Sequence, residues 1–198
     1  MVKYLFILFS FAFSAVTVGT NGNYHFTTIQ EAIDSVTFNP IDTEINVYPG
    51  IYQENLLIES DMVILSMGDA TNTIIDGSLG RGLGSTVVIR PGSGSAHKPD
   101  VEIDGFEITG GKGTDIKNKT ITLPDGTHPI EKVGGGIFVY VNSPKINNCK
   151  IIENGNLDVD KGGGVFAVSD KEDSDFSTRD DYVDSNELTP ADSVLDLS

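Results

Sequence analysis

The chain has 198 residues, of which 38% are hydrophobic and 21% charged, a balance that fits one ordinary globular domain. Its 22 glycines and its lack of tryptophan favour short strands joined by tight turns and argue against an all-helical fold. A formal net charge of -16 would repel a phosphate backbone and anionic lipid headgroups, so we expect no nucleic-acid partner.

The first residues predict a signal peptide over residues 1–19. Lys3 precedes an apolar run from Leu5 to about Val18, and small residues stand at Thr17 and Gly19, as in a secretory leader. The run is short for a membrane span and no second run follows it. We therefore expect a secreted, extracellular or cell-surface protein with no membrane span after cleavage, with an uncleaved anchor as the alternative.

A short amphipathic helix is expected over residues 28–36. Thr28 and Glu31 have the spacing of a capping box, in which each side chain accepts a hydrogen bond from the backbone amide of the other residue. One helical face is apolar and consists of Ile29, Ala32, Ile33 and Val36. Such a face needs a partner, and we expect it to cap the end of a stack of strands.

Short β-rich runs punctuated by glycine follow from Glu44 onward, and they repeat. The motif GGGIFV at Gly134 recurs as GGGVFA at Gly162, about 28 residues later. A repeat of this length with three short strands is typical of one coil of a parallel β-helix, in which coils stack about 4.8 Å apart. Equivalent residues would then form columns along the stack.

A second pair of segments supports the same repeat. IDGFEITGG from Ile103 can be aligned with INNCKIIEN from Ile146, which matches Phe106 with Cys149 and Ile108 with Ile151. Asp104–Gly105 and Asn147–Asn148 then fall at one turn, where the backbone must tolerate a left-handed conformation. The only cysteine excludes an intrachain disulfide, and we interpret it as a small apolar core residue.

The predicted β-helix covers residues 20–168, and an acidic tail follows over 169–198. The tail holds ten acidic and two basic residues, a composition that predicts disorder. The alternative is that its few apolar residues fold back over the last coil. Were that coil left open, self-association through its end would be possible.

Several of these segments together resemble the pectin-lyase-like superfamily. The resemblance rests on GNYHFTTIQEAIDSV, INVYPGIYQENLLI, IIDG, IDGFEITGG and GGGIFV, within residues 22–168, and the opening stretch is similar to pectin methylesterases and bacterial right-handed β-helix proteins. It implies an all-β, right-handed parallel β-helix with an N-terminal capping helix. The superfamily contains polysaccharide lyases, glycoside hydrolases and esterases, along with non-catalytic surface proteins and adhesins, so the fold leaves the activity open.

No catalytic residue can be assigned from the resemblance. The later aspartates, glutamine and arginine segment of the esterases have no counterpart here, and neither have the calcium-binding acids and the basic residue of the lyases. We therefore expect a secreted, non-catalytic module that contacts extracellular polysaccharide. The alternatives are a polysaccharide-active enzyme, whether lyase, hydrolase or carbohydrate esterase, and a truncated β-helix adhesin.

A candidate saccharide surface is predicted on one outer face. If Ile137, Val139 and Val141 point inward, their strand neighbours point outward, and STVVIR places Arg90 in the same outer columns. We call the resulting set the aromatic strip: Arg90, Phe138, Tyr140 and Phe166. Aromatic faces stack on sugar rings, which makes the strip a possible saccharide track. The alternative is that another segment covers it.

Residues 111–133 interrupt the repeat as an insertion just before this strand. The insertion is the most basic part of the chain, with Lys112, Lys117, Lys119, His128 and Lys132. In the family that the chain resembles, loops at this turn wall the substrate groove. Lys119 and His128 are therefore candidate contacts for uronate carboxylates, and ordinary solvation or packing of the loop is the alternative.

No cofactor and no metal site are expected from the sequence. The three histidines lack the spacing of zinc ligands. Asp158 and Asp160 form a loose acidic pair that makes calcium conceivable, but two carboxylates are no calcium cage, and we favour a turn-stabilising role.

Overall fold

The computed structural model describes residues 15–38, 43–79, 84–117, 123–126, 130–140, 142–155, 159, 161–168, 183–184 and 196–197. Most of the expected leader and most of the acidic tail lie outside these ranges. The described elements are one helix and seventeen strands. Their bounds are β1 Val16–Val18, α1 Ile29–Phe38, β2 Glu44–Val47, β3 Gly50–Tyr52, β4 Leu56–Ile58, β5 Met62–Ser66, β6 Thr73–Asp76, β7 Val87–Ile89, β8 Val101–Asp104, β9 Glu107–Thr109, β10 Thr114–Lys117, β11 Ile130–Val133, β12 Ile137–Tyr140, β13 Lys145–Asn147, β14 Lys150–Ile151, β15 Val165–Val168, β16 Val183–Asp184 and β17 Asp196–Leu197.

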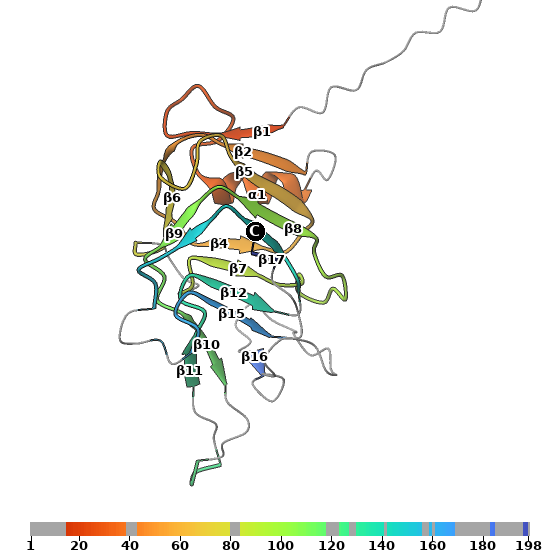
Figure 1. The fold of residues 1–198 in the computed structure, drawn as a ribbon. Coiled ribbons are helices and arrows are strands. Elements are labelled where there is room, and N and C mark those ends of the chain that lie inside the picture. The colour runs from red at the N-terminus through yellow and green to blue at the C-terminus, as the bar shows by residue number, and fades with distance from the viewer. Residues whose placement is uncertain are drawn as a thin grey trace, which may run out of the picture.

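Most of the strands form three parallel sheets. Sheet A has the order β1-β2-β5-β8-β13-β17, sheet B β3-β6-β9-β14, and sheet C β4-β7-β12-β15. From β2 onward the chain visits sheets A, B and C in rotation, so each strand lies beside its counterpart from the next round, as Figure 1 shows. Among the described residues the hairpin β10–β11 is the one antiparallel pair, and it interrupts the rotation between β9 and β12. The β-rich fold with parallel sheets is therefore as predicted.

The strand registers agree with the repeats found in the sequence. Phe138 of β12 pairs with Phe166 of β15, so the two glycine-rich motifs lie side by side. Ile103 pairs with Ile146, and Ile108 pairs with Ile151. Both sequence alignments are thus confirmed residue by residue.

A single apolar core lies between the three sheets. Alternate side chains of each strand enter it, which is why buried and half-buried positions alternate along β2, β4, β5, β6 and β8. Cys149 packs partly buried against this core, and burial raises the pKa of its thiol. That environment suits the apolar role expected for Cys149, because a reactive cysteine needs a lowered pKa.

Helix α1 lies where the sequence placed it and buries the predicted face: Ile29, Ala32, Ile33 and Val36. Thr28 Oγ1 accepts a hydrogen bond from the Glu31 amide at 3.4 Å. The main cap comes from outside the helix, because Glu54 accepts from the amides of Ile29 (2.8 Å) and Gln30 (2.9 Å). Burial raises the pKa of Glu54, and the two amide donors oppose that rise.

Two turn features explain residue choices in the repeats. Gly105 and Asn148 both have positive φ, 82° and 50°, at the turn between sheets A and B. A Cβ on Gly135 would lie 2.4 Å from the carbonyl oxygen of Gly163, so the stacked glycine motifs allow a backbone approach that a side chain would block.

The N-terminal edge of sheet A is formed by β1, which pairs in parallel with β2. Val18 is 0% exposed and belongs to the core. These residues lie within the range 1–19 that the sequence assigned to the leader. No helix in the described ranges is long and apolar enough to cross a membrane.

Two short strands lie in the segment expected to be disordered. β17 extends sheet A beside β13, and β16 pairs with β10. The other residues of 169–198 lie outside the described ranges.

Candidate functional site

The aromatic strip points outward from sheet C, as its alternation predicts. Phe138 pairs with Val88 on one side and with Phe166 on the other, and the two phenyl rings stack with centroids 6.4 Å apart and an interplanar angle of 12°. Ile137 and Val139 belong to the main core, whereas Phe138 and Tyr140 form part of a second, separate apolar cluster.

This second cluster is covered. Ile116 of β10 and Val133 of β11 are fully buried against it, so the insertion packs its hairpin onto the outer face of sheet C. As a result Phe138 is 1% exposed and Tyr140 8%, while Phe166 is half-buried. A sugar ring could stack on Phe138 or Tyr140 only if the hairpin moved away. The aromatic strip is therefore covered by another segment, which was the alternative to an open saccharide track.

Two charged residues of this region, Arg90 and Lys132, are engaged in ion pairs. Arg90 is 9% exposed, and its Nε lies 3.0 Å from Glu59 Oε1. In the insertion, Lys132 Nζ lies 2.6 Å from Asp115 Oδ1. Arg90 and Lys132 thus support the packing of this face rather than an open groove. The two other predicted contacts, Lys119 and His128, lie outside the described residues, as do Asp158 and Asp160.

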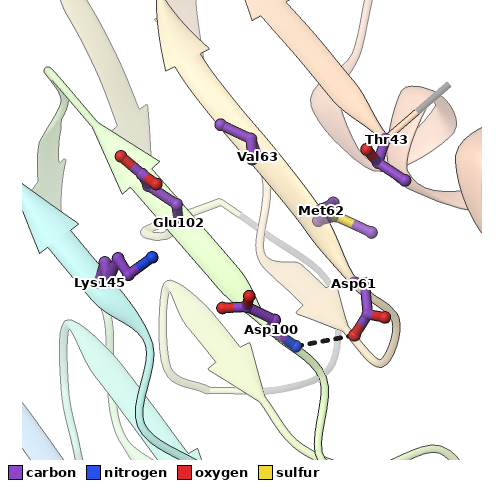
Figure 2. Close-up of a pocket in the computed structure, with 7 residues that line it drawn as sticks. All are labelled: Thr43, Asp61, Met62, Val63, Asp100, Glu102 and Lys145. Atoms are coloured by element: carbon purple, nitrogen blue, oxygen red, sulfur yellow. Dashed lines mark hydrogen bonds between the residues drawn. The ribbon is translucent and has the colours of Figure 1, made fainter.

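A groove of about 250 Å³ lies on the outer face of sheet A, which, unlike the outer face of sheet C, is not covered by the β10–β11 hairpin. Figure 2 shows the residues that line the groove. The lining mixes carboxylates with a lysine, a hydroxyl and two apolar residues. Its residues are Thr43, Asp61, Met62, Val63, Asp100, Glu102 and Lys145. We call this the sheet A groove.

Strand register brings the centre of the groove together. Glu102 of β8 pairs with Val63 of β5 on one side and with Lys145 of β13 on the other. Their inward neighbours Ile64, Ile103 and Ile146 are in the core, so these three side chains point outward in one row. Glu102 Oε1 also accepts a hydrogen bond from Asn147 Nδ2 at 3.1 Å, which fixes the carboxylate at the groove wall.

The rim of the groove is built around Asp61. Its Oδ1 accepts a hydrogen bond from the amide of Asp100 at 2.8 Å and lies 2.7 Å from His97 Nε2. The Asp100 amide, followed by His97, lowers the pKa of the Asp61 carboxyl. Asp61 is therefore ionised at neutral pH, which suits a hydrogen-bond acceptor and not a proton donor.

This set of groups can bind polar ligands rich in hydroxyls. Ionised carboxylates accept hydrogen bonds, the ammonium of Lys145 donates them, and the hydroxyl of Thr43 can do both. Val63 is half-buried and adds an apolar side chain to the lining, whereas the Met62 side chain belongs to the main core. Within the described residues no three His, Cys, Asp or Glu side chains gather as they would around a metal ion.

None of the groove residues was among the predicted site residues. Asp61, Asp100 and Lys145 come from three rounds of the chain, and no short motif joins them. The alignment of Ile103 with Ile146 does imply that Glu102 lies beside Lys145, and this signal could have found part of the groove. A comparison with protein-family models and one with curated proteins find no match to the sequence.

Proposed function

We propose that the chain is a secreted right-handed parallel β-helix module, akin to the pectin-lyase-like superfamily, that binds extracellular polysaccharide without cleaving it. The rotation of successive strands through sheets A, B and C supports the fold, because stacked three-strand coils produce that order. The observation that carries the binding proposal is the sheet A groove, with its mixed lining of carboxylates, ammonium, hydroxyl and apolar groups.

The negative charge of the groove favours a neutral polysaccharide over an anionic one. Asp61, Asp100 and Glu102 outnumber the one cation in the lining, Lys145, and the whole chain carries a net charge of -16. Uronate carboxylates would be repelled here. We therefore favour a neutral glycan, in contrast to the uronate contact expected from the basic insertion. At about 250 Å³ the groove is smaller than the ~300–1,000 Å³ typical of pockets for drug-sized ligands, so it would hold only a short stretch of a glycan chain.

The test is a binding assay on the full chain with neutral glucans, pectin and alginate, combined with a reducing-end assay on each. Glu102→Gln removes one charged acceptor and is expected to weaken neutral-glucan binding about tenfold. Glu107→Gln is the matched control, because Glu107 lies on sheet B, outside the groove.

Each result bears on one part of the proposal. Binding to a neutral glucan that Glu102→Gln weakens and Glu107→Gln leaves unchanged supports the groove. Preference for pectin or alginate contradicts the argument from charge. Release of new reducing ends favours the alternative of a polysaccharide-active enzyme that cleaves the chain, because hydrolases and lyases both create a reducing end. Absence of binding to every glycan removes the polysaccharide function.

A further inference from the structure

Residues 16–19, which fall within the expected leader, are hydrogen-bonded into the fold. Besides the pairing of β1 with β2, the amide of Tyr48 donates to the Val18 carbonyl at 2.9 Å. The amide of Gly19 donates to Phe26, and the amide of Phe26 donates back to Thr17, both at 3.1 Å. The segment is thus hydrogen-bonded on both sides.

Side chains in the same segment complete the N-terminal end of the core. Val18 is fully buried in the cluster that contains Ile29 and Ile33 of α1. The amide of Thr17 donates to His25 Nδ1 at 3.1 Å, and the amide of His25 donates to Thr17 Oγ1 at 3.2 Å. Removal of β1 would expose the apolar face of α1 and leave the Tyr48 amide without its partner.

Within residues 10–19 the sequence offers four places where small residues stand two apart, as a secretory leader requires before the cleaved bond. They are Ser10 with Ala12, Ala12 with Ser14, Ala15 with Thr17, and Thr17 with Gly19. Cleavage after either of the last two pairs would remove part or all of β1. The first two pairs lie ahead of β1.

We propose that the leader is removed ahead of Val16, at the Ala12–Phe13 or the Ser14–Ala15 bond, and that β1 is the first strand of the mature protein. This inference rests on the proposed secretion. The step is a hydrolysis by a leader peptidase: water adds its oxygen to the acyl carbon, the C–N bond breaks, and the released amine takes the proton. The mature chain then begins at Phe13 or Ala15 and keeps every residue of β1.

The experiment expresses the full chain with its own N-terminus in a secreting host and determines the intact mass and N-terminal sequence of the exported protein. An N-terminus at Phe13 or Ala15 is the expected result. Exported, folded protein that begins at Thr20 would overturn the inference while leaving secretion intact. Protein retained in the cell with Met1 would overturn the secretion on which the inference depends.

A second measurement isolates the structural part from export. Two truncated chains are produced in the cytosol, one beginning at Val16 and one at Thr20, and their thermal unfolding is compared. Loss of β1 is expected to lower the Tm by about 10 °C or more, since each 1 kcal/mol corresponds to about 2–4 °C in a chain of this size. Equal Tm values would show that β1 is dispensable and would overturn the inference whatever the host does.

Discussion

The outer faces of sheets C and A share one backbone arrangement and differ in what their outward columns contain. On sheet C the column Leu57, Val88, Phe138 and Phe166 is apolar, and the β10–β11 hairpin packs onto it. On sheet A the column Glu44, Val63, Glu102 and Lys145 is mixed, and it borders a groove. Alternation alone shows which side chains point away from the main core. The composition of the column shows whether a face is covered or open.

The largest expected effect follows from the covered face. Because Phe138 is buried, Phe138→Ala should lower the free energy of unfolding by about 3–5 kcal/mol. Val63→Ala on the open face should cost about 1 kcal/mol or less, since Val63 is only half-buried. Urea unfolding of both variants measures the difference. Equal losses would mean that the strip is exposed in solution and that the comparison fails.

The hairpin itself should show the next largest effect. Ile116 is fully buried against the strip, so Ile116→Ala should cost about 2 kcal/mol or more and increase the fluorescence of a dye that binds exposed apolar surface. Ile130 of the same hairpin is 51% exposed, and Ile130→Ala should stay within about 0.5 kcal/mol of wild type. Similar values for the two variants would contradict a packed hairpin.

At the open face, acidification should loosen the rim. The pKa of Asp61 is lower in the folded chain than in the unfolded chain, so its stabilising effect is present above the unfolded value, about 3.9, and is lost as pH falls through the folded value. The Asp100 amide resonance reports this loss locally in an NMR pH titration. Asp61→Asn should abolish the dependence on pH, and a titration that persists in Asp61→Asn would assign it to another group.

The smallest effect on stability is expected for Glu102→Gln. The substituted amide keeps an oxygen that can accept from Asn147, and the site faces solvent, so the free energy of unfolding should change by about 0.5 kcal/mol or less. Denaturant unfolding of the same preparation used for glycan binding checks this. A large destabilisation would mean that a loss of binding reflects loss of structure and not loss of a ligand contact.

Much of the strand arrangement was predictable because it depends on local repetition. The match of GGGIFV with GGGVFA fixed the partners of Phe138 and Phe166, and the helix followed from the spacing of Ile29, Ala32, Ile33 and Val36. Each signal is a short motif or a fixed spacing that can be recognised without knowledge of the rest of the fold.

The coverage of sheet C and the groove on sheet A could not be read in the same way. The insertion was recognised from its length and charge. The face of sheet C on which it packs depends on Ile116 and Val133, which lie in two strands of a hairpin whose register the sequence does not reveal. Asp61 and Asp100 meet through a hydrogen bond from the Asp100 amide to the Asp61 carboxylate, 39 positions away, and such a contact leaves no periodic trace in the sequence. Long-range contacts of loops are set by tertiary packing, not by pattern.

The cap on α1 bears on how the chain assembles. Glu54 lies 25 positions beyond the amide of Ile29 that it caps, so the helix cannot acquire this cap until β2 and β3 have been synthesised. We therefore expect the helix and the first strands to order together. Because the chain is synthesised from its N-terminus, all residues of this first unit are present before those of the later repeats, which can then add to its edge.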